Sequence, residues 1–91
     1  MALPKDQLLN EIDEALRLCS VELDRLPGDL ALKKEHSALN AIRAMILDRW
    51  PLTPQERSRV NIGIYAIREL EGINEELVAK LATLEQHLTL G

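Results

Sequence analysis

Aromatic residues are nearly missing from this sequence of 91 residues, which has no phenylalanine, one tryptophan and one tyrosine. The apolar residues, 46% of the chain, are mainly aliphatic, with 18 leucines and 7 isoleucines. Leucine and alanine favour helices, whereas the residues that are typical of strands are sparse. The composition therefore predicts an all-α fold, and the length predicts a single helical domain over residues 1–91.

Cysteine, basic charge and long apolar runs are also scarce. The lone Cys19 stands at a helical core spacing and provides neither a disulfide framework nor a thiolate metal site. A net charge of −4 argues against nucleic acid as a partner. No stretch is typical of a membrane span, a basic amphipathic segment or a secretory leader. We therefore expect a cytoplasmic protein that binds neither nucleic acid nor a membrane.

Turn signals divide the chain into about four helices, which predicts a small antiparallel bundle. Pro27-Gly28 separates the first two helices, and Asp29 is placed to cap the second. A threonine cap, an N1 proline and an N3 glutamate follow at residues 53–56, which is the pattern of a capping box. Asn74 is the expected cap of the last helix. The expected helices cover residues 4–26, 29–49, 53–71 and 74–88.

The segment from Ala38 to Trp50 is apolar around most of a helix, so we expect the second helix to lie in the middle of the bundle. Glu35 and Arg43 lie close to the apolar stripe of this helix and each needs a partner. Arg43 is interpreted as a structural ion-pair residue. The Trp50 side chain either plugs the core at the end of this helix or contacts a partner.

The last two expected helices have apolar faces of different kinds. Gly63 lies on the apolar side of the third helix, where it lets a neighbouring helix come close. The whole expected apolar side is Val60, Gly63, Ile64, Ile67 and Leu70. Tyr65 lies on the other side and either covers the core or contacts a partner. The fourth helix has a narrow seam that either closes the bundle or pairs with a second copy of the chain, formed by Leu77, Leu81, Leu84 and Leu88.

No motif in the sequence indicates catalysis. The two histidines, His36 and His87, belong to no metal-ligand pattern, and no glycine-rich phosphate loop occurs. The third helix resembles the start of a helix-turn-helix only faintly, because no basic recognition helix follows it. We therefore expect no enzyme activity, no metal and no cofactor. The residues by themselves predict a small acidic bundle that binds another protein.

Taken together, the landmarks of the chain resemble a known family across residues 10–77. These are the small helical immunity proteins that neutralise the type VI secretion effector whose toxin domain is an NAD(P)-glycohydrolase. The resemblance rests on Ile12-Asp13, Ala15-Leu16, Leu18, Leu23, Arg25, Pro27-Gly28, Leu32, Ile42-Arg43, Leu47-Asp48-Arg49, Gly63, Ala66, Glu69, Glu76 and Leu77. His36 stands where an acid is expected, and the linker over residues 51–56 is longer by about one residue.

The resemblance implies an antitoxin that binds its cognate toxin domain, about one to one, and blocks the entry of a dinucleotide to the active site. Acidic side chains suit such a partner, because clefts that bind phosphate-bearing substrates are typically electropositive. The candidate contacts, chosen for expected exposure and for charge or aromatic character, are Asp13, Glu14, Asp24, Trp50, Tyr65 and Glu69. The acids of the first helix are alternatively a solvated surface. The blocked reaction is NAD(P) hydrolysis, ADP-ribosyl transfer or pyrophosphoryl transfer, and the alternative function is a homodimeric scaffold.

Overall fold

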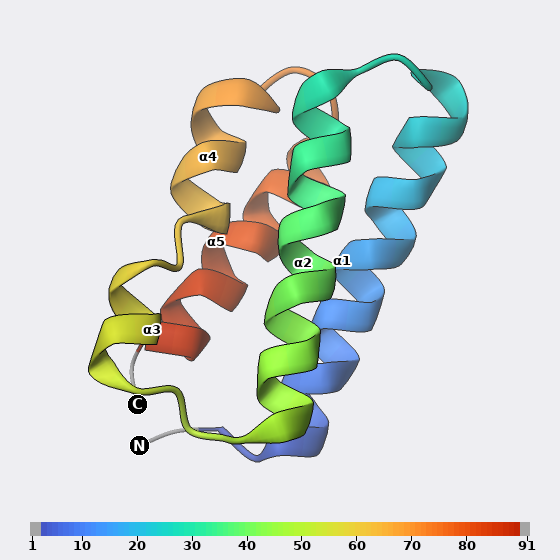
Figure 1. Ribbon diagram of the computed structural model, residues 1–91. Coiled ribbons are helices and arrows are strands. Elements are labelled where there is room, and N and C mark those ends of the chain that lie inside the picture. The colour runs from blue at the N-terminus through green and yellow to red at the C-terminus, as the bar shows by residue number, and fades with distance from the viewer. Residues whose placement is uncertain (1–2, 90–91) are drawn as a thin grey trace.

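The computed structural model describes residues 3–89, and residues 1, 2, 90 and 91 of the predicted domain lie outside the described residues. Within this range all regular structure is helical, as the composition predicts. The helices are α1 (Lys5–Arg25), α2 (Leu30–Asp48), α3 (Pro54–Ser58), α4 (Ile62–Glu69) and α5 (Glu75–Thr89). The four longer helices run alternately up and down, and the short α3 lies at one end of the bundle (Figure 1).

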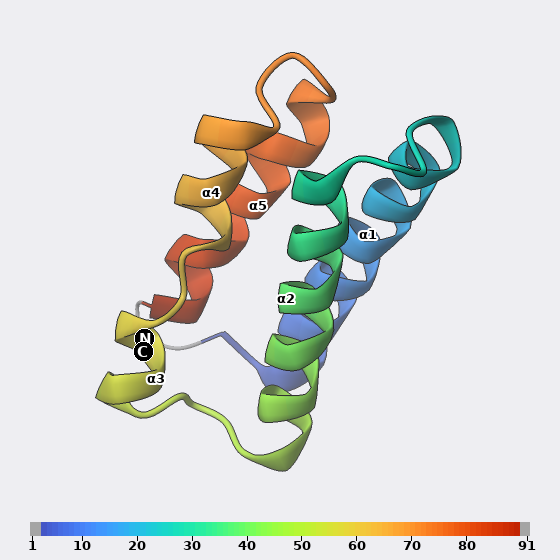
Figure 2. The ribbon, with the colours of Figure 1, turned by 45° about the horizontal axis from the view of Figure 1, so that its top comes forward.

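The bundle consists of two antiparallel helix pairs, α1 with α2 and α4 with α5 (Figure 2). The pairs are joined where α5 packs against α1 and where α2 packs against α4. Leucine and isoleucine side chains from all four long helices fill the space between them, and burying them provides most of the drive to fold. Twelve of the seventeen buried apolar residues are Leu8, Ile12, Leu18, Leu32, Leu39, Ile42, Ile46, Ile62, Leu70, Leu77, Leu81 and Leu84.

The expected position of α2 in the middle of the bundle is wrong. Its stripe of Leu32, Leu39 and Ile46 is buried, but Leu30 and Leu47 are 78% and 50% exposed. The prediction counted the alanines as buried positions. Alanine favours a helix because it loses no side-chain entropy there, and it is also common on solvated surfaces. The α2 helix is therefore one wall of the bundle, packed against α1 and α4, and not its centre.

The expected caps are confirmed. The Asp29 carboxylate accepts a hydrogen bond from the Leu32 N–H at 2.9 Å, and the Asn74 side chain accepts one from the Leu77 N–H at 3.0 Å. At the start of α3 the Thr53 hydroxyl and the Glu56 carboxylate satisfy each other's backbone N–H groups, which completes the predicted capping box. These signals are local in sequence, so they fix helix starts without help from the rest of the fold.

The third expected helix is broken, which contradicts the predicted span of residues 53–71. The chain leaves helical geometry after Ser58 and resumes it at Ile62. Asn61, the N-cap of α4, makes no side-chain cap. The carboxylate of Glu85 on α5 takes that role by accepting hydrogen bonds from the N–H groups of Gly63 at 3.0 Å and Ile64 at 3.5 Å. A helix can start at this point because a distant residue satisfies its free N–H groups.

The break turns α4 relative to the expected apolar side. Ile62, Gly63 and Ala66 face the core, whereas Ile64 and Ile67 are 54% and 50% exposed. The role of Gly63 is confirmed, since a Cβ atom there would lie only 2.9 Å from the Cα atom of Ala82 on α5. The absence of a side chain at Gly63 therefore allows α4 and α5 to pack closely.

The seam of the last helix lies inside the bundle, which is one of the two arrangements that its spacing allows. Leu77, Leu81 and Leu88 are fully buried, and Leu84 is 1% exposed. Pairing with a second copy through these side chains requires the bundle to open. The outer face of α5 remains accessible and includes Glu75 and Ala79.

Candidate functional site: the partner-binding residues

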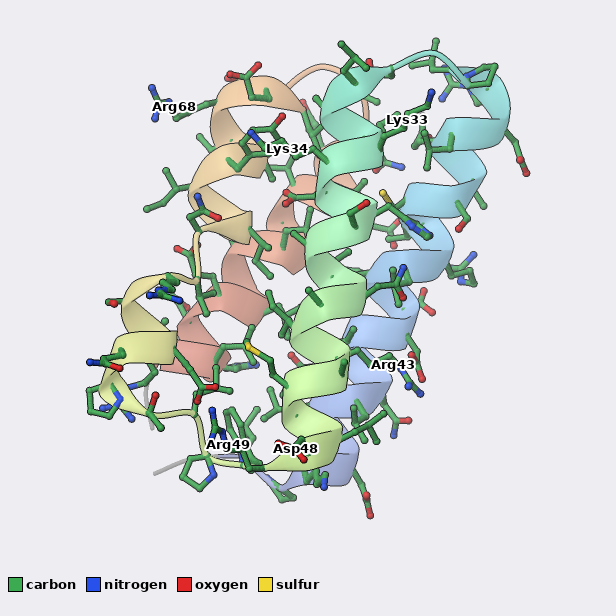
Figure 3. All side chains as sticks on the ribbon, viewed as in Figure 1. Lys33, Lys34, Arg43, Asp48, Arg49 and Arg68 are labelled. Carbon is green, nitrogen blue, oxygen red and sulfur yellow. The ribbon has the colours of Figure 1, made fainter. Side chains whose placement is uncertain are left out.

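Three of the candidate contacts lie on α1. The Asp13 side chain, 50% exposed, accepts a hydrogen bond from the Arg43 guanidinium on α2 at 2.8 Å, and Figure 3 shows Arg43 on the side of α2 toward α1. The predicted role of Arg43 in an ion pair is therefore confirmed. Glu14 pairs with Arg17 one turn later, and the hydrogen bond from Arg17 lowers the pKa of this carboxyl. Asp24 is exposed in the last turn of α1.

Of the other three candidate contacts, Trp50 follows the end of α2, and Tyr65 and Glu69 lie on α4. The indole N–H of Trp50 donates to the Leu3 carbonyl at 2.8 Å, and the half-buried ring packs on the core. Tyr65 on α4 is half-buried beneath the Lys34 ammonium group, which lies 5.3 Å from the ring centroid. Figure 3 shows Lys34 between α2 and α4. Glu69 is exposed at the end of α4.

The fold does not gather these six residues into one patch. In the described part of the chain α1 and α4 share no contact, and α2 lies against both of them. Trp50 and Asp24 lie near opposite ends of the α1–α2 pair, because one follows the end of α2 and the other precedes its start. A single partner surface of ordinary size covers only some of them at once.

The sequence pattern did not reveal a second surface, which lies between α4 and α5. Ile67 projects beside a hollow of about 350 Å³ whose other walls are Glu71, Glu75, Val78, Ala79 and Ala82. Ile64 is exposed one turn earlier on the same helix. One signal for this surface was present in the sequence. Residues two apart on a helix point in nearly opposite directions, so Ile62 and Ile64 cannot both face the core.

A larger and more polar hollow, of about 530 Å³, lies on the other side of α5, against α1. Ala79 lines both hollows, so they form one surface that follows the outer face of α5. The walls of the second hollow are Gln7, Asn10, Glu11, Glu14, Ala79, Lys80 and Thr83. Glu14 is thus the one candidate contact that lies on this surface.

The interior contains a carboxyl group without a complete set of hydrogen bonds. Glu35 on α2 is 1% exposed, and its Oε2 atom has no hydrogen-bond partner. The expectation that Glu35 reaches a partner is therefore wrong. Burial, with a further contribution from the nearby Glu85 charge, raises the pKa of Glu35 to about 8. The protonated, uncharged form therefore predominates at neutral pH.

The buried Cys19 thiol, which lies near Glu35, has low reactivity. The Cys19 thiol is fully buried and contacts the Leu32 carbonyl oxygen at 3.4 Å. Burial, followed by the charge of Glu35, raises the pKa of Cys19 to about 11, so the reactive thiolate is rare. Neither hollow beside α5 is lined by Cys19 or Glu35. This arrangement indicates a structural role for both groups.

A second buried acid links two helices. Glu22 near the end of α1 is 4% exposed and pairs with Arg25 at 2.7 Å. Its other oxygen accepts a hydrogen bond at 3.1 Å from the side-chain amide of Asn74, the cap of α5. At this end of α1 Leu26 is 38% exposed, whereas Leu18 and Glu22 are buried.

Two general properties bear on the class of protein. No helix within residues 3–89 combines the length and the apolar character that crossing a bilayer requires. In the same range no three histidine, cysteine or acidic side chains lie together as metal ligands would.

Comparison with protein families matches residues 7–88 to Tsi6. Comparisons with curated proteins and with solved structures gave no significant match. The family match extends beyond Leu77, where the resemblance in sequence was expected to end, and includes nearly all of α5. Because the match covers most of the chain, the protein belongs to the Tsi6 family of type VI immunity proteins.

Proposed function

We propose that this protein neutralises one cognate type VI effector by binding its toxin domain and covering the active site. The observation that carries the proposal is the family match over residues 7–88. The toxin in this proposal consumes NAD(P), as the resemblance in sequence implies. Inhibition by occlusion requires no catalytic chemistry from the immunity protein. In this proposal one immunity protein binds one toxin domain.

The structure supports a binding role through rigidity and charge. The helices are fixed by local caps, by the Glu85 contact to the start of α4 and by the Glu22–Asn74 link. A rigid surface loses little conformational entropy when it binds, which favours high affinity. The net charge of −4 attracts a basic active-site region at long range and speeds association.

The proposal is tested by co-purifying the chain with the toxin domain encoded beside its gene and then measuring NAD(P) consumption. We expect a stable complex and a loss of NAD(P) consumption that is complete at about equal molar amounts. The control adds an unrelated small helical protein at the same concentration. A stable complex in which the toxin remains fully active contradicts occlusion. The absence of any complex contradicts the antitoxin function, and the homodimeric scaffold then becomes the leading account.

The same experiment tests the antitoxin function separately from the identity of the toxin's substrate. If a complex forms and the free toxin instead transfers an ADP-ribosyl or pyrophosphoryl group, the immunity function stands and the proposed substrate is wrong. The relevant measurement is product analysis of the free toxin, with the complex as the inhibited reference. The molar mass of the isolated chain in solution, measured in parallel, shows whether it is a monomer before it binds.

A further inference from the structure

We infer that the outer face of α5, together with the exposed side of α4, is the surface that holds the toxin domain. This inference rests on the proposed function, because it assigns a place to the partner proposed above. It commits to a partner surface with an apolar side chain that enters the α4–α5 hollow and basic side chains around it. We name this surface the α4–α5 face and define its anchor region by Ile64, Ile67, Glu71, Glu75 and Val78.

The apolar surface is continuous beside the α4–α5 hollow. Ile67, 50% exposed, forms a wall of the hollow with Val78, Ala79 and Ala82. Ile64, 54% exposed, extends this apolar area along α4. Among the large exposed aliphatic residues in the described part of the chain, Ile67 is the one that lines a hollow beside α5. Contiguous apolar surface next to a hollow is typical of the buried centre of an interface, whereas single exposed leucines are common everywhere.

The surface around the two hollows is mainly acidic. The charged residues that line the two hollows are four glutamates and one lysine: Glu11, Glu14, Glu71, Glu75 and Lys80. Arg68 belongs to the same helix as Ile67, but Figure 3 shows it directed away from the bundle at the end of α4. The walls of the α4–α5 hollow itself are acidic or apolar. Such a surface complements a basic region, and a toxin that binds a phosphate-bearing dinucleotide has such a region around its active site.

Exposure of the two isoleucines to water has an energetic cost. The core is filled by buried aliphatic side chains, whereas Ile64 and Ile67 face solvent. The Glu85 contacts hold the start of α4 and with it the orientation that exposes these two side chains. Exposed isoleucine pairs lower solubility and add no stability to the isolated chain. A partner that covers them removes this apolar surface from water, and this is the favourable contribution of an interface anchor.

The test compares substitutions on the α4–α5 face with matched substitutions on α2. Ile67→Glu and Leu47→Glu place the same charge at residues that are both 50% exposed. Glu71→Lys and Asp48→Lys reverse one exposed acid each, and Figure 3 shows Asp48 at the end of α2, distant from α4. Circular dichroism and urea unfolding of each free variant first establish that it is folded. Affinity and rates are then measured with the isolated toxin domain.

We expect Ile67→Glu to weaken binding at least about 100-fold, mainly by faster dissociation, as truncation of an interface anchor does. Glu71→Lys should weaken it about tenfold and reduce its dependence on salt. The α2 controls should stay within about threefold of the wild type. The inference is overturned if the wild type binds and the variants of the α4–α5 face bind like their α2 controls. That outcome leaves the antitoxin function intact, whereas a wild type that does not bind refutes both.

Discussion

The Arg43 guanidinium on α2 donates a hydrogen bond to the Asp13 carboxylate on α1 at 2.8 Å, across thirty residues of sequence. One of these residues was expected to form a structural ion pair, and the other was expected to contact a partner. Both side chains remain at least one-third exposed, so the pair contributes little to stability. The carboxylate of Asp13 is therefore partly neutralised on the surface that it was expected to present to the toxin.

Charge reversal on α1 tests whether its acids speed the association with the toxin without contributing to the dissociation rate of the complex. Asp13→Lys and Asp24→Lys should each slow association with the toxin a few-fold at low salt and reduce its salt dependence, while helicity and the dissociation rate stay unchanged. Stopped-flow association at several salt concentrations measures this. The exchange of both partners, Asp13→Arg with Arg43→Asp, keeps the ion pair and the net charge and should restore the wild-type rate. If Asp24→Lys leaves the association rate unchanged, the acids of α1 form only a solvated surface.

Replacing Gly63 by alanine should loosen the α4–α5 contact. The new Cβ atom would lie 2.9 Å from the Ala82 Cα atom and 3.1 Å from the Leu81 carbonyl oxygen, so backbone must move. We expect a loss of about 1–2 kcal/mol in the free energy of unfolding, because overpacking outweighs the gain of about 1 kcal/mol in helix propensity. Urea denaturation measures it. Gly28→Ala, where a Cβ atom meets nothing within 4 Å, should be nearly neutral. Equal stability of the two variants contradicts the close approach at Gly63.

The buried Glu35 predicts an unusual dependence of stability on pH. The pKa of its carboxyl is about 8 in the folded protein, whereas the ordinary glutamate pKa of 4.5 applies to the unfolded chain. Between these values the folded state keeps a proton that the unfolded state has lost, so raising the pH favours unfolding. We expect stability to fall by on the order of several kcal/mol from about pH 5 to about pH 8, and Glu35→Gln should abolish this fall.

The measurement is the urea midpoint of the wild type and the variant across this pH range. Glu56→Gln is the control, because the hydrogen bond from Arg49 is the main cause that lowers the pKa of Glu56 to about 2. The stability that Glu56 contributes is present above pH 4.5 and is lost only toward acid pH. This control should therefore retain the fall toward pH 8. A wild-type fall that persists in Glu35→Gln assigns the pH dependence to another group.

Asn74 has two roles that one substitution can separate. Its oxygen caps α5 at the Leu77 N–H, and its amide donates to the buried Glu22 carboxylate at 3.1 Å. Asn74→Asp keeps a good cap but places two carboxylates together, so we expect a loss of about 1–3 kcal/mol at neutral pH that shrinks toward acid pH. Thermal or urea unfolding measures this. The reverse exchange at the α2 cap, Asp29→Asn, should be almost neutral, and an equally small effect at Asn74 contradicts the link to Glu22.

Features that depend on neighbouring residues in the chain were predictable. The capping box at Thr53, the caps at Asp29 and Asn74 and the close approach at Gly63 each follow from a few adjacent residues. The family resemblance also followed from the sequence, and the match to Tsi6 confirms it over a longer stretch than expected. Such features account for the helix count apart from one break.

The break before α4 was not predictable, because the group that caps this helix is Glu85, more than twenty residues away. The error then spread, since a helix that starts at Ile62 presents Ile64 and Ile67 to solvent and hides Ala66. The candidate contacts were chosen by charge and expected exposure, and neither property shows which helices adjoin. For that reason the α4–α5 face was not among the candidates, although Glu14 beside it was.

The contact between Trp50 and the Leu3 carbonyl makes the protein's only tryptophan an intrinsic fluorescence reporter of one end of the bundle. Its emission follows the docking of the segment before α1 onto the end of α2, whereas circular dichroism follows all the helices together. Coincidence of the two unfolding curves therefore establishes that the bundle melts as one cooperative unit, and an earlier fluorescence change identifies fraying at this end. The same emission also reports, without any added label, whether a bound toxin reaches that corner.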